Sequence, residues 1–214
     1  MTAEELAALH PRLFHLTAPT AWPGILRDGL LSTAALLDRL GLPEAERLAL
    51  TTRRRPREVP LPDGAGGEVV LNDNLPLQEA ALARCLEDGL TPAEWLSMLN
   101  ARVFFWADEA GLARLLAARM NRGRRRAVLV VDTLSLATAH ATRMEICPIN
   151  SGATIRRAAR RGRATFTPLG AMTYTQWQRR RASHRRDRIL EVVVREGVPD
   201  LENHLIERKE VVGA

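Results

Sequence analysis

A single carboxylate, Glu191, stands at the head of the last strongly β-branched stretch of the chain. It lies in the run RILEVVVREGVPD, in which Val192–Val194 predict a strand because β-branched side chains pack well on a pleated surface. The carboxylate is a functional group, or the polar position of an edge strand, or the partner of Arg188 or Arg195 in a salt bridge. A chain with this feature is expected to build its function around the strand.

A second informative strand is predicted near the beginning of the chain, at LFHLT. Alternation along a strand puts His15 and Thr17 on one face and Phe14 and Leu16 on the other. Together, a strand that carries His and a distant strand that carries Glu191 are able to form a split nucleotide site. The alternative for His15 is a core histidine whose hydrogen bonds are satisfied within the protein.

The 214-residue chain is long enough for one well-buried domain, and it alternates short helices and strands without internal repeats. Capping boxes at Thr2–Glu5 and Thr91–Glu94 begin two of the helices, and AVLVVDT is the clearest buried strand. Further strands are predicted at 69–71, 103–107, 143–149, 189–194 and 205–212. We therefore expect residues 1–214 to form a single α+β domain with a split, mixed β-sheet surrounded by helices.

Composition limits the class of protein. The apolar fraction of 46% is that of a globular protein, no apolar run approaches the length of a membrane span, and the N-terminal segment lacks a signal-peptide core. The two cysteines, Cys85 and Cys147, have neither C-x-x-C spacing nor an accompanying histidine cluster. We expect a protein of the reducing cytoplasm, with no disulfide framework, no metal site and no membrane partner.

The formal charge of +6 comes almost entirely from arginine, since Lys209 is the single lysine. Arginine forks bind phosphates with two donors at once, so clustered arginines favour a partner such as DNA or RNA, although solvated surface loops are the alternative. We interpret residues 155–187 as a long basic loop, with a helix around Tyr174–Arg180. The candidate nucleic-acid-binding residues are Arg156, Arg157, Arg160, Arg179 and Arg180.

Motifs of other nucleotide and acyl-transfer chemistries are missing from the sequence. It contains no G-x-G-x-x-G after a strand, no G-x-x-x-x-G-K-[ST] and no G-x-S-x-G. Asp132 ends a hydrophobic strand without a second carboxylate at suitable spacing, so we expect it to cap a helix at 133–140. The triplet Asn150–Gly152 predicts a turn or, alternatively, a cradle of backbone N–H groups for a phosphate.

Two segments carry a resemblance to a known family. LFHLT-x(5)-PGILRDGLLS and RILEVVVREGVPD resemble the opening and closing motifs of the DarT-like branch of the ADP-ribosyltransferases. The whole chain, with LNARVFFWAD, VLVVDT and PINSG in order, more closely resembles an uncharacterised bacterial family of similar length, DUF7002. The resemblance to the enzymes covers the two ends and the general order of strands, and VFFWAD departs from their central motif.

The enzyme resemblance implies a split β-sheet of ADP-ribosyltransferase type that grips NAD. In the DarT-like enzymes ADP-ribose is transferred to a DNA base. Glu191 matches the catalytic carboxylate, and Arg54 is the choice for the catalytic arginine, with Arg53 or Arg55 as alternatives. His15 would bind the adenine-side ribose, and Thr17 the nicotinamide amide. An aromatic face for nicotinamide would come from Phe105, Trp106 or Phe104, for which core packing is the alternative.

The expected function is therefore NAD-dependent transfer of ADP-ribose to nucleic acid or protein, in a toxin or defence factor that has an antitoxin protein as a partner. NAD is expected as a substrate, with no metal. One alternative is a catalytically degenerate module of the same fold that binds a nucleotide or nucleic acid. Another is an antitoxin-like protein whose basic loop docks onto an acidic surface.

Overall fold

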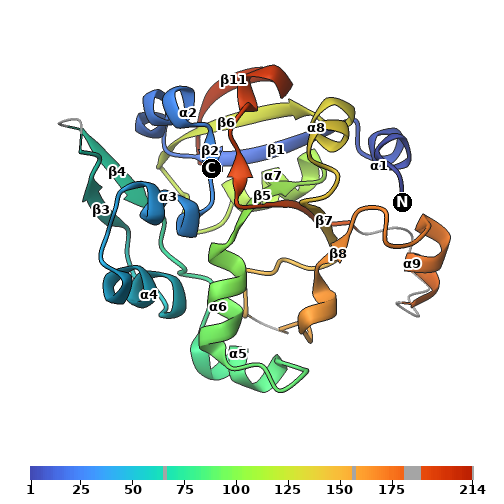
Figure 1. Ribbon diagram of the computed structural model, residues 1–214, viewed down its shortest axis with the longest axis horizontal. Helices are drawn as coiled ribbons and strands as arrows, with labels where there is room; N and C mark the ends of the chain where they lie inside the picture. The colour runs from blue at the N-terminus through green and yellow to red at the C-terminus, as the bar shows by residue number, and fades with distance from the viewer. Residues whose placement is uncertain (65–66, 156–157, 181–188, 214) are drawn as a thin grey trace.

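A seven-stranded sheet forms the centre of the molecule in the computed structural model, which describes residues 1–64, 67–155, 158–180 and 189–213 (Figure 1). The strand order is β11-β6-β1-β5-β9-β7-β8. These strands are β1 (Arg12–Thr17), β5 (Arg102–Trp106), β6 (Arg125–Asp132), β7 (Met144–Cys147), β8 (Thr167–Pro168), β9 (Glu191–Arg195) and β11 (Leu205–Val212). Two small sheets pair β2 (Leu30–Leu31) with β10 (Gly197–Val198), and β3 (Val59–Pro62) with β4 (Glu68–Leu71).

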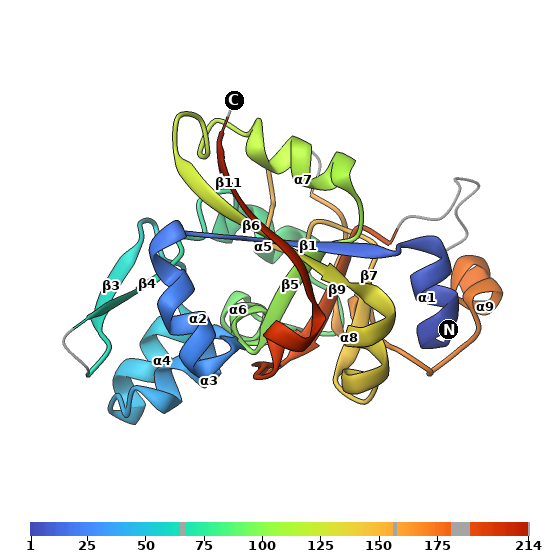
Figure 2. The ribbon, with the colours of Figure 1, turned by 90° about the horizontal axis from the view of Figure 1, so that it is seen from above.

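Helices cover both faces of this sheet, as Figure 2 shows for α7 on one side and α2 and α8 on the other. The α-helices are α1 (Ala3–Leu9), α2 (Trp22–Asp28), α3 (Thr33–Arg39), α4 (Glu44–Thr52), α5 (Glu79–Cys85), α6 (Pro92–Asn100), α7 (Glu109–Leu116), α8 (Thr133–His140) and α9 (Tyr174–Arg180). Short 3-10 helices are η1 (Pro19–Ala21), η2 (Arg163–Thr165) and η3 (Leu201–His204). The chain is a single compact α+β domain.

Each face of the sheet has its own apolar core. On one face, Leu129 and Val192 pack with Leu136 of α8 and with α1 and α2. On the other, Val130 packs with Leu112 of α7, while Val193 packs in a separate cluster with α5 and α6. A further apolar cluster joins α3 and α4 to the β3–β4 hairpin, which stands beside the sheet (Figure 1).

The expectation of a mixed sheet is wrong, because every described pairing in the seven-stranded sheet is antiparallel. The run Ala127–Val131 is buried on both faces, as strands of parallel sheets usually are. Here helices cover both faces of an antiparallel sheet, so a continuous apolar run arises without parallel neighbours. Strands that follow one another in the chain are often not neighbours in the sheet: β5 and β6 lie on either side of β1, so the chain crosses over between them.

Local signals in the sequence correctly place several helix ends. Thr2 and Glu5 form a complete capping box, as do Thr91 and Glu94, with Pro92 at the first helical position. The carboxylate of Asp132 accepts from the backbone N–H of Ser135 and so caps α8. Among the described residues, no helix has the length and apolar character needed to cross a membrane.

The middle of the chain shows two departures from the predictions. Strand β3 was not predicted because it carries two prolines, Pro60 and Pro62, which are confined to edge strands since they cannot donate to a ladder. The predicted loop at 155–187 also contains η2 and β8 within its described residues, and neither was expected. The helix predicted at Tyr174–Arg180 is confirmed as α9. Arg156 and Arg157 lie outside the described residues, as does the side chain of Arg180.

Gly29, between α2 and β2, packs closely against the backbone of Pro199, the residue that follows β10. Its φ of 76° is left-handed, and a Cβ at this position would lie 2.3 Å from the Cα of Pro199. Gly41 has a similar φ of 67°, but a Cβ there would meet nothing within 4 Å. We expect Gly41→Ala to cost about 1 kcal/mol of unfolding free energy and Gly29→Ala at least twice as much, since backbone must move. Urea unfolding measures the loss of unfolding free energy in both variants. Equal losses would contradict the close packing of Gly29 against Pro199.

Candidate functional site

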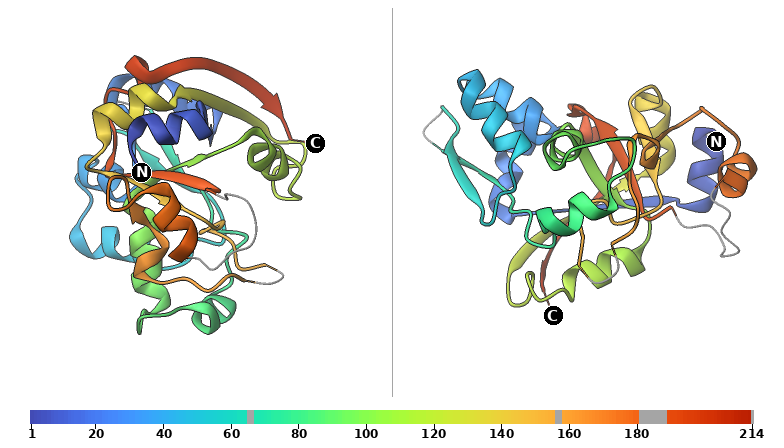
Figure 3. Two further views of the ribbon diagram at one scale, coloured as in Figure 1. Left: turned by 90° about the vertical axis from the view of Figure 1, so that its right-hand side faces the viewer. Right: turned by 90° about the horizontal axis from the view of Figure 1, so that it is seen from below.

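The seven-stranded sheet is split between β1 and β5. β1 pairs with β6 along its whole length, from Arg12 to Thr17, whereas the register pair that joins β1 to β5 is Phe14 with Trp106. Beyond it, the next link across the seam is a side-chain hydrogen bond from His15 to the carbonyl of Phe104, at 2.9 Å. In the left view of Figure 3, β11 and β9, which belong to the two halves, lie well apart.

A cavity of about 400 Å³ lies at this split. Its walls come from both halves of the sheet, from α2 and β2, and from the β4 segment that stands beside the sheet. His15 and Thr17 of β1 line it on one side and Glu191 of β9 on the other, so the structure brings these three predicted residues to one cavity. The volume falls in the range of small-molecule binding pockets.

Glu191 is nearly buried, with 5% of its surface exposed. It is the first residue of β9, and it lies between Trp106 of β5 and Cys147 of β7 in the register of the sheet. The hydroxyl of Ser151 donates to its Oε2 at 2.7 Å, and the backbone N–H of Ser151 lies 3.2 Å from Oε1. Because β9 is a central strand and the carboxylate bonds Ser151, the edge-strand alternative is wrong.

Burial raises the pKa of Glu191 from its usual range to about 7. Hydrogen bonds from Ser151 and the Cys147 thiol, and then the charge of Arg161, act in the opposite direction without cancelling this effect. The same burial raises the pKa of the Cys147 thiol, and the neighbouring carboxylate raises it further. A carboxyl group that titrates near neutral pH at the wall of a cavity is suited to proton transfer and to charge stabilisation.

Arg161 fixes the turn at Ser151 through hydrogen bonds to its backbone. This guanidinium is 1% exposed and donates from Nη1 to the Ser151 carbonyl at 2.8 Å and from Nη2 to the Ala153 carbonyl at 3.0 Å. It lies over the ring of Trp95, whose Nε1 also donates to the Ser151 carbonyl at 3.3 Å. The predicted turn at 150–152 is confirmed, and its backbone N–H at Ser151 binds a carboxylate of the protein itself.

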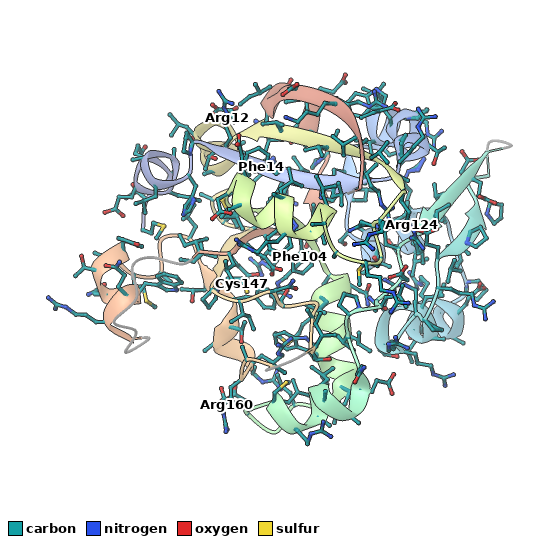
Figure 4. The ribbon with its side chains drawn as sticks, turned by 180° about the vertical axis from the view of Figure 1, so that it is seen from behind. Arg12, Phe14, Phe104, Arg124, Cys147 and Arg160 are labelled. Carbon is teal, nitrogen blue, oxygen red and sulfur yellow. The ribbon has the colours of Figure 1, made fainter. Side chains whose placement is uncertain are left out.

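Sequence reasoning missed the role of Arg161. It lies in the same basic run as Arg160, which is exposed and pairs with Glu87 at 2.5 Å. Nothing in the local pattern separates a buried arginine from its solvated neighbour, because burial here depends on Trp95 and on the carbonyl groups of the turn. Figure 4 shows Arg160 at the margin of the molecule, while Phe104 and Cys147 lie near its centre.

The histidine of β1 is neutral and presents one acceptor. A carbonyl oxygen only accepts, so the bond to Phe104 places the ring hydrogen of His15 on Nδ1 and leaves Nε2 as an acceptor. Burial lowers the pKa of His15 more than this hydrogen bond raises it, which keeps the ring uncharged near neutral pH. Thr17, two residues further on the same face, is 8% exposed at the cavity.

The cavity is lined by Arg55, and Arg54 is not among its lining residues. Arg55 is 6% exposed and donates to the carbonyl of Asn72 at 3.0 Å and to Oδ1 of Asn100 at 3.0 Å. Burial lowers its pKa, and the charge of Asp73 partly offsets this. Arg54 instead donates to the carbonyl of Leu77. The alternative Arg55, and not the first choice Arg54, therefore lines the cavity, as does Arg102 of β5.

The aromatic run of β5 divides between the two faces of the sheet. Trp106 and Phe104 line the cavity. Phe105 is fully buried in the core with Leu129 and Val192, on the same face as His15, whose ring centroid lies 5.7 Å from its own, and it is not among the residues that line the cavity. Strand alternation makes this division unavoidable once Trp106 faces the split.

The predicted nucleic-acid-binding arginines do not line the cavity in the described part of the chain. Arg160 and Arg179 are exposed on the surface, the second on α9. The predicted binding of nucleic acid by these arginines therefore applies to the outer surface of the protein and not to the cavity.

The fold and the cavity define a single-domain α+β protein with a ligand-sized pocket at a split antiparallel sheet. Residues 11–205 match the model of a protein family described as a family of unknown function, DUF7002. The chain therefore belongs to the DUF7002 family. No curated protein matches the chain.

The ionisation of Glu191 makes a prediction about stability. Folding favours the protonated carboxyl, because the pKa is about 7 in the folded protein and 4.5 is the ordinary value. Wild type should lose stability as pH rises from about 4.5 through about 7, and Glu191→Gln should not. Between pH 5 and pH 8, the unfolding free energy of Glu191→Gln should therefore rise by about 2–3 kcal/mol relative to that of wild type, as measured by urea unfolding. The exposed control Glu207→Gln should show the same pH dependence of stability as wild type. If Glu191→Gln shows that dependence too, the raised pKa of Glu191 is refuted.

Proposed function

We propose that the chain is an NAD-dependent ADP-ribosyltransferase that transfers ADP-ribose from NAD to nucleic acid or protein. The observation that carries the proposal is the meeting of His15 and Thr17 from one half of the sheet with Glu191 from the other at one cavity. The same three residues belong to the two sequence segments that resemble the DarT-like enzymes. The resemblance and the geometry are separate arguments for one site.

The residues of the cavity fit the chemical demands of NAD. Neutral His15 has an acceptor at Nε2 for a hydroxyl of the adenine-side ribose, and Thr17 can bind the nicotinamide amide. Trp106 or Phe104 supplies an aromatic surface for the nicotinamide ring. Arg55 places a positive charge at the same cavity, which favours the negatively charged pyrophosphate.

Glu191 has the central role in the proposed reaction. NAD supplies ADP-ribose and releases nicotinamide, and positive charge develops on the ribose as this bond breaks. The ionised carboxylate of Glu191 stabilises that charge and then accepts the proton of the attacking acceptor. Ser151 keeps the carboxylate in place through its hydroxyl and backbone N–H, and Arg161 keeps Ser151 in place.

The exposed arginines support a nucleic acid as the acceptor. The chain has a formal charge of +6, and Arg160 and Arg179 lie on the surface, where they can contact phosphates without entering the cavity.

Release of nicotinamide from NAD tests the proposal. We expect the purified protein to release nicotinamide, measured by liquid chromatography, and to do so faster with single-stranded DNA or RNA. Glu191→Gln keeps an acceptor for Ser151 but has no charge, and it should lower the rate about 100-fold or more. Glu207→Gln, on the exposed part of β11, should match wild type.

Two results would contradict the proposal. One is unchanged release in Glu191→Gln, which would remove the carboxylate from the reaction. The other is binding of NAD or nucleic acid by wild type without release under any of these conditions, which would favour the degenerate binding module.

The hydrogen bond from Ser151 predicts a shift in pH dependence. It lowers the pKa of Glu191, so its loss in Ser151→Ala should raise that pKa. Because the ionised carboxylate is the active form, nicotinamide release should rise with pH through about 7 in wild type. In Ser151→Ala this rise should move up by about one pH unit, as a hydrogen bond to a charged group contributes about 1.5 kcal/mol. Ser97→Ala, exposed on α6, is the control, and identical profiles for all three proteins would contradict the assigned role.

A further inference from the structure

Three possible metal ligands meet between α8 and η3, outside the cavity of Glu191. They are His140 at the end of α8, Asp200 just before η3 and His204 at its end, and their ligand atoms all lie within 4.8 Å of one another. The histidines are 7% and 5% exposed, whereas Asp200 has 37% of its side chain exposed. The cluster therefore has a buried imidazole wall and an open side toward solvent.

The imidazole of His204 is oriented for a ligand by its own second contact. Its Nδ1 lies 2.7 Å from the hydroxyl of Ser135, and its Nε2 lies 3.3 Å from Oδ2 of Asp200. A carboxylate only accepts, so in the metal-free protein Nε2 of His204 carries the ring hydrogen and the Ser135 hydroxyl donates to Nδ1. When a metal binds Nε2, the hydrogen moves to Nδ1, and the serine hydroxyl is able to accept it. A hydrogen bond on the far nitrogen is the usual way in which proteins fix a metal-binding histidine.

We propose that His140, Asp200 and His204 bind a divalent transition-metal ion such as Zn²⁺. Two imidazole nitrogens and one carboxylate oxygen form a donor set that zinc takes in proteins, and the solvent-facing side leaves a coordination position for water. The sequence predicted no metal because the two cysteines lack zinc spacing. The fold supplies a different set of ligands, from residues 60 positions apart.

The hydrogen bond from Arg143 to His140 competes with metal binding and so lowers the affinity of the proposed site for a metal ion. Its Nη2 lies 2.8 Å from Nδ1 of His140, and because a guanidinium only donates, Nε2 of His140 carries the hydrogen in the metal-free protein. That hydrogen is directed at Oδ1 of Asp200, at 2.7 Å. When a metal binds Nε2, the hydrogen must move to Nδ1 and this contact with Arg143 must open. Nη1 of Arg143 can retain its bonds to the carbonyls of Arg195 and Gly197.

Calorimetric titration of Zn²⁺ into untagged protein, freed of metal with a chelator that is then removed, tests the site. We expect one ion per chain. Asp200→Asn and His204→Gln should each weaken binding about 100-fold or more, and Arg143→Gln should strengthen it about 10-fold because the competing donor is gone. His10→Gln is the matched control, since His10 bonds the Ala107 carbonyl elsewhere in the fold.

Absence of Zn²⁺ binding by wild type, or unchanged affinity in Asp200→Asn, would overturn the proposal. Circular dichroism of each metal-free variant checks that it is folded. If a ligand variant fails to fold, Arg143→Gln decides, because it retains all three ligands: equal or weaker affinity than wild type refutes the geometry. The absorption spectrum of bound Co²⁺ gives a second readout, and it should be lost in His204→Gln and retained in His10→Gln.

Discussion

The arrangement of the site depends on how little joins the two halves of the seven-stranded sheet. β1 meets β5 at the pair Phe14–Trp106, and beyond it the side chain of His15 bonds the carbonyl of Phe104. A continuous ladder along this seam would close the space between the halves with backbone hydrogen bonds. Because the seam stays open, residues of β1 and Glu191 of β9 face the same cavity although they are separated by most of the chain.

The second constraint is the burial of a carboxylate in the centre of the sheet. Removing Glu191 from water disfavours its charge, and its pKa near 7 reflects that cost after the surrounding hydrogen bonds have reduced it. The loop after β7 supplies those bonds at Ser151, and buried Arg161 and Trp95 hold the loop. An apolar residue at position 191 would pack without this support.

Much of the fold could be predicted from local patterns. Alternation placed His15 on a strand, the β-branched run placed Glu191 on another, and capping signals placed the helix ends. The antiparallel pairing could not be predicted, because an apolar run shows burial on both faces and not strand direction. The site was only partly predictable: which residues of β5 meet the split depends on its register with β1, and Arg161 differs from its basic neighbours only through tertiary contacts.

The position of bound NAD tests the proposed site. A crystal structure with a carbocyclic NAD analogue, whose bond to nicotinamide resists cleavage, would locate both riboses. We predict that the ring bearing nicotinamide lies within hydrogen-bonding distance of the Glu191 carboxylate, and that the adenine-side ribose contacts His15. An analogue bound outside the cavity at the split, or none bound at saturating concentration, would contradict the proposed site.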